Sequence, residues 1–281
     1  MRNVVFKPVL TAIKQLSKCQ PYGLFRTVWI NVGAILLRGE RIGESNIRSS
    51  GADAFSVLLN GRYKKMSATD AESSPNVVKT GTVTVGIKIK DGVLLAADQR
   101  ATMGNYIAGS HVQKVYQLAD NLGMTISGSV GDAQLMIRYM QSELAIYKME
   151  KGALITVQTA ATYLGRAIRG FYMAPIIAGY DKTGGHVFSV DMAGGVLEDD
   201  YISSGSGEIL AYGVLEAQYK PGMSKKDGID VLIAALNSAR RRDVYNGDGM
   251  IMAYIGPKGF EWIPQEDLKA RYAELGFAYP N

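Results

Sequence analysis

A strict alternation of residue types begins at Thr82, and it constrains the fold more than any other feature of the chain. Valine or isoleucine occupies every second position from 83 to 89, and the positions between hold threonine, glycine or lysine. A period of two is typical of a β-strand with one buried face. Asp91-Gly92 and the apolar residues 93–97 follow directly, which indicates a tight turn and a second strand. The sequence therefore predicts a β-hairpin from residue 82.

The remaining elements are predicted in an order that defines a fold class. Strands are expected at residues 114–118, 124–130, 175–179, 186–192, 197–202, 250–255 and 260–263, and helices at 132–151, 156–172, 208–218, 225–241 and 265–275. Strands, two helices, strands and two helices again indicate an α+β protein with two packed sheets covered by helices on both sides. The regular βα alternation and the glycine fingerprint of a dinucleotide-binding fold are both missing.

Composition supports one domain and argues against a nucleic-acid partner. The 281 residues are 47% hydrophobic and 20% charged, enough to bury one sizeable core. The net charge of +5 comes from the leading segment, because residues 1–81 carry 12 basic and 5 acidic residues, against 19 and 21 in the rest. The folded part is therefore not expected to present a basic patch.

Two interpretations of the leading segment stay open. Residues 1–39 contain no acidic residue, which is one mark of an organellar transit peptide. Residues 66–75 form a polar stretch that looks like a short disordered propeptide, so translation could start at Met66, the interpretation that we favour. The apolar run 22–37 is interrupted by Arg26 and is shorter than the roughly 20 residues of a membrane span. No membrane association is predicted.

Cysteine and histidine are too scarce for several kinds of site. Cys19 is the only cysteine, so a disulfide framework within the chain is not possible, and a cytosolic location fits best. His111 and His186 are too few for the usual histidine zinc clusters, and both are expected to be surface or strand residues. We expect no metal and no organic cofactor.

A series of spaced motifs carries a family resemblance. Lys79-Thr80-Gly81-Thr82-Val83-Thr84-Val85-Gly86 is followed by Asp98-Gln99-Arg100, Lys114, Gly128-Ser129-Val130-Gly131-Asp132, Ser204-Gly205-Ser206-Gly207, Tyr212-Gly213-Val214-Leu215-Glu216 and Arg242-Asp243. Together they resemble the proteasome beta family, of the archaeal type, over residues 80–281. The resemblance implies the four-layer αββα sandwich of the N-terminal nucleophile hydrolases, which agrees with the predicted order of elements.

The resemblance implies that Thr82 is the nucleophile of a threonine endopeptidase. A threonine hydroxyl needs a neighbouring base, and a free α-amino group, with a pKa of about 7.7 to 8.0, can serve. Cleavage between Gly81 and Thr82 would remove residues 1–81 as a propeptide and leave a peptidase domain of residues 82–281. On the local pattern alone, an exposed strand threonine would be the better interpretation of Thr82, and the full set of spaced motifs reverses that preference.

Further catalytic roles follow from the resemblance. Lys114 is expected beside the nucleophile with Asp98 as its charge partner, Arg100 supporting this network, and Gly128 offering its N–H to the oxyanion. Ser206 and Asp243 match residues that bond around the α-amine and the catalytic water. Asn246 departs from the family pattern, which usually has serine there; an asparagine side chain both donates and accepts hydrogen bonds.

The resemblance also predicts substrate positions and partners. The pocket for the side chain before the scissile bond corresponds to Ala101, Val112, Tyr116, Ile126 and Val130, and Thr102, Gly128 and Val130 offer backbone groups to the peptide. These uncharged walls favour chymotrypsin-like cleavage after large apolar residues. Expected partners are beta subunits in seven-membered rings, alpha-subunit rings, an ATP-driven regulatory unfoldase and unfolded polypeptides. The alternative is a non-catalytic structural subunit of the ring.

Overall fold

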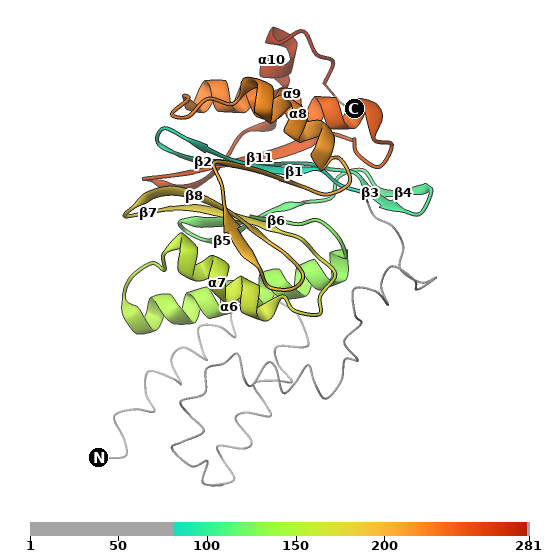
Figure 1. Cartoon of the computed structure of the whole chain (residues 1–281). Helices are drawn as coiled ribbons and strands as arrows, with labels where there is room; N and C mark the ends of the chain where they lie inside the picture. Colours follow the sequence, from blue (N-terminus) through green and yellow to red (C-terminus); the bar gives the residue numbers. More distant parts are fainter. Residues whose placement is uncertain (1–80, 280–281) are drawn as a thin grey trace, which may run out of the picture. The chain divides into compact units, whose positions relative to one another are not determined.

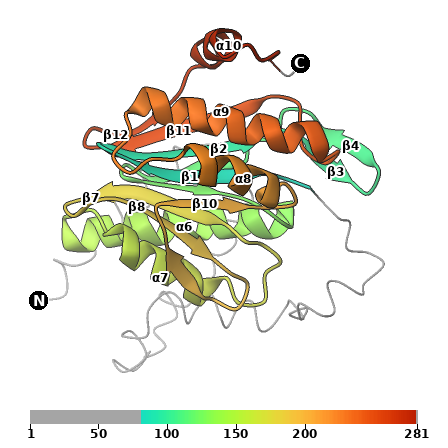
Figure 2. The ribbon, with the colours of Figure 1, turned by 45° about the horizontal axis from the view of Figure 1, so that its top comes forward.

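The computed structural model describes residues 81–279, and these form four layers (Figure 1). Two five-stranded sheets face each other and helices cover both outer faces, as a view from a second side also shows (Figure 2). The predicted α+β sandwich is confirmed. The expectations for residues 1–80, including the start at Met66, lie outside the described residues.

The first sheet has the strand order β10-β1-β2-β11-β12, and α8 and α9 pack on its outer face. Its elements are β1 (Thr84–Ile89), β2 (Gly92–Asp98), β10 (Tyr201–Ser204), α8 (Glu208–Gln218), α9 (Lys225–Arg242), β11 (Met250–Gly256) and β12 (Gly259–Trp262). A last helix, α10 (Gln265–Glu274), buries Leu268 and Tyr272 in the same core.

The second sheet has the order β5-β6-β7-β8-β9, and α6 and α7 cover its outer face. Its elements are β5 (Val115–Ala119), β6 (Leu122–Thr125), α6 (Val130–Lys151), α7 (Val157–Ala167), β7 (Ile176–Asp181), β8 (Gly184–Val190) and β9 (Val196–Glu198). A separate two-stranded hairpin, β3 (Ala101–Met103) and β4 (Tyr106–Gly109), lies beside the sheets.

The alternation that begins at Thr82 explains how the first hairpin is buried on two faces. The apolar residues of β1 at positions 83, 85, 87 and 89 join the core under α8 and α9, while Val93, Leu95 and Ala97 of β2 enter the core between the sheets. Gly86 faces the second sheet, where an added Cβ would lie 2.9 Å from Val187. The small residue thus lets the two sheets approach closely.

Three predicted elements differ from the structure. The strand expected at 124–130 ends at Thr125, because Ser129 caps the helix that begins at Val130. The strand expected at 197–202 is two strands, β9 and β10, in different sheets. The helix expected at 156–172 ends at Ala167.

Candidate active site

Thr82 lies just before β1 with both neighbouring peptide groups held by hydrogen bonds. Its side chain and backbone are 5% exposed. Its N–H donates to Ser206 Oγ at 3.1 Å, and its carbonyl accepts from Gly207 N–H at 3.2 Å. The N–H of Gly81 donates to Thr102 Oγ1 at 3.1 Å. The Gly81–Thr82 peptide bond is therefore fixed from both sides.

Two glycines, Gly81 in the junction and Gly205 beside Thr82, occupy positions where a side chain would not fit. A Cβ at Gly81 would lie 1.8 Å from Cβ of Tyr245, a distance that no pair of carbon atoms without a covalent bond can adopt. Gly205 has φ of +107°, and a Cβ there would lie 2.2 Å from the carbonyl oxygen of Thr82. The junction is thus packed against backbone and side chain with no room for larger residues.

A buried ion pair lies next to the Thr82 hydroxyl. Lys114 Nζ donates to Asp98 Oδ1 at 2.7 Å, and the two side chains are 5% and 4% exposed. Thr82 Oγ1 lies 3.5 Å from the same carboxylate oxygen, at the long limit of a hydrogen bond. Burial lowers the pKa of the Lys114 ammonium, and the attraction of Asp98 opposes this fall. Burial raises the pKa of Asp98, against the opposing attraction of Lys114.

The backbone holds Asp98 as well. Its carboxylate accepts three main-chain hydrogen bonds, from the N–H groups of Val83 at 3.0 Å, Arg100 at 3.1 Å and Gly247 at 3.2 Å. Such a set of donors favours the ionised carboxylate. Asp98 therefore has a nearly complete set of partners even apart from Lys114.

A second network lies on the other side of Thr82. The Ser206 hydroxyl donates to Asp243 Oδ2 at 2.6 Å, and Asn246 Nδ2 donates to the same oxygen at 2.6 Å. Because the Ser206 hydroxyl directs its hydrogen to Asp243, a lone pair of its oxygen is free to accept from the N–H of Thr82. Asn246 is 1% exposed, and its Oδ1 has no hydrogen-bond partner among the described residues.

Arg100 links the loop after α9 to the ion pair. Its guanidinium donates to both carboxylate oxygens of Asp248, at 2.7 and 2.9 Å, and to the carbonyl oxygen of Val244 at 2.9 Å. These hydrogen bonds hold the loop on both sides of Asn246, at Val244 and at Asp248, as expected for a residue that supports the network. Asp248 was not predicted as part of the site; its only sequence signal is the Asp-Gly pair at 248–249.

Gly128 lies in the segment between β6 and α6. Its φ is +104°, and a Cβ there would lie 2.4 Å from the carbonyl oxygen of Tyr172. Only glycine fits this approach, and it brings the backbone of residue 128 to the same hollow as Thr82 and Lys114.

The hollow beside Thr82 is small and has mostly apolar walls. Its volume is about 20 Å³, and the predicted pocket residues Ala101, Val112, Ile126 and Val130 line it. Tyr116 does not, which differs from the sequence expectation: Val115 enters the core between the sheets, and Tyr116 packs against the core under α6 and α7. Thr102 also lies outside the lining, and its hydroxyl accepts the hydrogen bond of Gly81.

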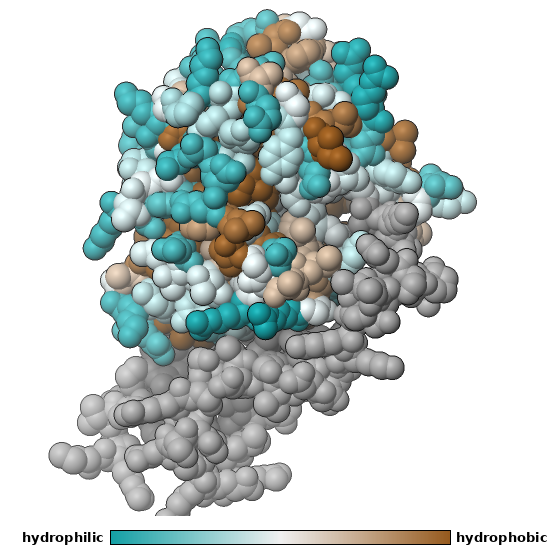
Figure 3. Space-filling view, in the orientation of Figure 1, coloured by the Kyte–Doolittle hydropathy of each residue, from teal (hydrophilic) through white to brown (hydrophobic). Residues whose placement is uncertain are grey.

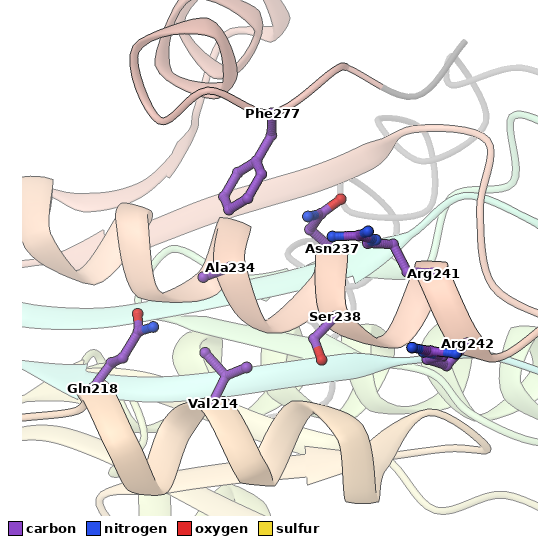
Figure 4. A pocket seen from close by; sticks show the side chains of 8 residues that line it. All are labelled: Val214, Gln218, Ala234, Asn237, Ser238, Arg241, Arg242 and Phe277. Carbon is purple, nitrogen blue, oxygen red and sulfur yellow. The ribbon is translucent and has the colours of Figure 1, made fainter.

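A larger hollow lies away from this site. It has a volume of about 580 Å³ and lies between α8, α9 and the segment that follows α10 (Figure 4). Its walls are formed by Val214, Gln218, Ala234, Asn237, Ser238, Arg241, Arg242 and Phe277. None of the predicted site residues lines it, so the larger of the two hollows is not the candidate active site.

The remaining sequence expectations concern metals, histidines and membranes. Within residues 81–279, no three His, Cys, Asp or Glu side chains are grouped so that they could hold a metal ion. His186 lies in β8 and contacts Glu198, and His111 is exposed between β4 and β5. None of the helices in this part of the chain is both long and apolar enough to cross a bilayer.

Comparisons with known proteins agree with this geometry. The family model described as "Proteasome subunit" matches residues 78–255. The chain is 40% identical to the proteasome subunit beta of Picrophilus torridus, over 71% of this chain and 97% of that protein. It is 42% identical to proteasome subunit beta 2 of Haloarcula marismortui, over 74% and 91%. For the proteasome subunit beta of Thermoplasma acidophilum the identity is 39%, over 71% and 97%.

Proposed function

Because this chain belongs to the proteasome beta subunit family, we propose that it is a catalytic subunit, an N-terminal threonine endopeptidase with Thr82 as its nucleophile. The observation that carries the proposal is the position of Thr82, whose buried hydroxyl lies beside the Asp98–Lys114 pair and whose N–H donates to Ser206 of the Ser206–Asp243 network. A strand threonine without a catalytic role would need neither network.

The first reaction is cleavage of the chain's own junction. Thr82 Oγ attacks the carbonyl carbon of Gly81, the C–N bond breaks, and the nitrogen takes a proton, which leaves an ester between Gly81 and the Thr82 hydroxyl. Water then hydrolyses the ester and releases residues 1–81. The positive charge of Lys114 favours the deprotonated hydroxyl during the attack.

The second reaction uses the amino group that the first one frees. The α-amine of Thr82 accepts the hydroxyl proton, the hydroxyl attacks a substrate carbonyl, and the backbone of Gly128 stabilises the oxyanion. Ser206, Asp243 and Asn246 hold the amine and the water that hydrolyses the acyl-enzyme. The mechanism calls for no metal and no organic cofactor.

Specificity follows from the walls of the hollow. Ala101, Val112, Ile126 and Val130 carry no charge, and the Lys114 ammonium, which also lines the hollow, is already paired with Asp98. A charged substrate side chain would therefore lose its hydration without gaining a free partner. The hollow of about 20 Å³ has to widen to admit a Leu, Phe or Tyr side chain, and burial of such a side chain against these walls gains about 1.5 to 3 kcal/mol. We therefore expect faster cleavage of fluorogenic peptides after Leu or Tyr than after Arg or Glu; the reverse order would exclude an apolar pocket.

Membership of the family implies assembly with other proteasome subunits, and the described surface is consistent with it. Apolar patches lie between polar side chains on the face in Figure 3. Large exposed apolar residues include Met103, Tyr106 and Ile107 on the β3–β4 hairpin. We propose seven-membered rings of beta subunits, flanking alpha rings, an ATP-driven regulator, unfolded polypeptide substrates and a cytosolic location.

The proposal is tested by the intact mass of the assembled subunit. The expected chain begins at Thr82, and Thr82→Ala should retain Gly81 and lose peptide hydrolysis, because one hydroxyl performs both reactions. A wild-type particle that keeps residues 66–81 and hydrolyses no peptide would favour the alternative, a structural ring subunit.

A further inference from the structure

Two buried serine hydroxyls outside the catalytic networks connect the segment between β6 and α6 with the end of β10, and Ser127 also lines the hollow beside Thr82. Ser127 lies between β6 and α6 and is 6% exposed; Ser204 is the last residue of β10 and is 8% exposed. Their Oγ atoms are 2.8 Å apart. Both also contact the carbonyl oxygen of Ala174, Ser127 at 2.6 Å and Ser204 at 2.7 Å. The three oxygens form a closed triangle.

The triangle holds fewer protons than contacts. Each hydroxyl can donate once, so two protons serve three short oxygen–oxygen contacts. If both hydroxyls donated to Ala174, two lone pairs would face each other across 2.8 Å. A chain in which one serine donates to the other, and that one to the carbonyl, places a hydrogen bond directly between the two serines and instead leaves one serine–carbonyl contact, at 2.6 or 2.7 Å, without a proton. Removing either hydroxyl breaks the chain.

Each serine is adjacent to one side of the active site. Ser127 precedes Gly128, and the backbone of residues 127–129 is tied to residues 172–174 by the bonds from Ser129 N to Tyr172 O at 2.7 Å and from Ala174 N to Ser127 O at 3.0 Å. Ser204 precedes Gly205, which touches the carbonyl of Thr82. Ser206, two residues further on, accepts from the N–H of Thr82.

We propose that Ser127 and Ser204 are positioning residues that fix the distance between the Gly128 backbone and the Thr82 hydroxyl. The proposal rests on the proposed function, since it assigns the oxyanion to the Gly128 segment. Within residues 81–279, this triangle is the side-chain link that joins the segment before Gly128 to the segment before Ser206. A shift of about 1 Å between nucleophile and oxyanion donor can lower a rate a hundredfold.

The test compares Ser204→Ala with a matched control from the same strand. Ser203 is also buried, and its hydroxyl donates one bond, to the carbonyl of Thr84 at 3.1 Å, but it points to the opposite face of β10. Ser203→Ala therefore removes a buried hydroxyl of equal size without touching the triangle. Full-length chains of wild type and variants are assembled, and peptide hydrolysis is normalised to the fraction of chains that begin at Thr82.

We expect Ser204→Ala to lower kcat about tenfold or more with KM within about twofold of wild type, and Ser203→Ala to keep kcat within about twofold. Ser127→Ala should match Ser204→Ala, and the double variant should be no slower than either single one, because one loss already breaks the triangle. Ser204→Thr keeps the hydroxyl and should restore kcat to at least about half of wild type. Junction cleavage, which needs no substrate binding, should slow in the same order.

The proposal would be overturned by an active wild type in which Ser204→Ala keeps its kcat, or by equal losses in Ser204→Ala and Ser203→Ala. A rise in KM at constant kcat would also contradict it, because it would assign the hydroxyls to substrate binding. An inactive, unprocessed wild type would instead refute the proposed function. Thermal unfolding of each variant separates these results from a failure to fold.

Discussion

Removing either partner of the buried Asp98–Lys114 pair should destabilise the chain, but by unequal amounts. Breaking a buried ion pair costs about 3 to 5 kcal/mol, because the remaining charge keeps no partner. In Lys114→Met, Asp98 keeps its three main-chain donors, so we expect a loss near 3 kcal/mol. In Asp98→Ala, Lys114 is unpaired and the same three N–H groups lose their acceptor, which adds at least about 2 kcal/mol.

The two variants should also respond to pH in opposite directions. In Lys114→Met, burial raises the pKa of Asp98 with no cation to oppose it. Between about pH 4, the ordinary pKa of an Asp, and the raised pKa of the folded state, the folded state binds more protons than the unfolded state, so the loss of stability grows as pH rises through this range. In Asp98→Ala, burial lowers the pKa of Lys114 unopposed. Between the lowered pKa of the folded state and about pH 10, the unfolded state binds more protons than the folded state, so this loss of stability shrinks as pH rises through this range.

Urea unfolding in a Thr82→Ala background measures these differences, because that background keeps the junction intact in every sample. Subunit concentration must be constant, since assembly contributes to apparent stability. We expect the double variant to be more stable than the sum of the single losses predicts, by about 2 kcal/mol or more. Equal losses in the single variants, or parallel pH dependence, would refute the assignment of a buried charged pair.

Three further predictions concern the junction and its networks. Gly81→Ala should slow junction cleavage at least about a hundredfold, since its Cβ would overlap that of Tyr245; mass spectrometry measures this, and the added change Tyr245→Gly should restore cleavage. Asn246→Ser should change peptide hydrolysis less than about tenfold, because a hydroxyl can still donate to Asp243; a several-hundredfold loss would show another role for Asn246. The rate of peptide hydrolysis should decrease as pH drops below the α-amine pKa of about 7.7 to 8.0, because a protonated amine cannot act as the base. Junction cleavage takes place before that amine exists, so its rate should not decrease in the same pH range.

How far the sequence predicts this structure depends on how local each feature is. The alternation from residue 82 predicted β1 and β2 because a strand and its turn are set by neighbouring residues. Helix α8 was predicted at its observed bounds for the same reason. The β3–β4 hairpin was missed, since its strands are three and four residues long and largely exposed. The pair of strands β9 and β10 looked like one strand, because only tertiary pairing assigns them to different sheets.

The site shows the same division between local and non-local information. Nothing in the spacing of Asp98 and Lys114 places their side chains 2.7 Å apart; the family resemblance suggested the pair, and the sheet packing brings it together. The contacts of Arg100 with Asp248 and of Ser127 with Ser204 join residues 148 and 77 positions apart. No periodic pattern reports contacts of that kind.

The contacts of Thr82 suit two chemical states of its nitrogen. In the uncleaved chain this nitrogen is an amide, which donates one hydrogen bond to Ser206 and cannot act as a base. After cleavage the same atom is an amine with a lone pair, and it can still donate to Ser206, whose own proton stays on Asp243. The network therefore needs no rearrangement when the base is created. Under the proposed mechanism, Lys114 and Asp98 are therefore the charged groups beside the hydroxyl during the first attack, and the contacts that hold the amide nitrogen before cleavage can hold the amine afterwards.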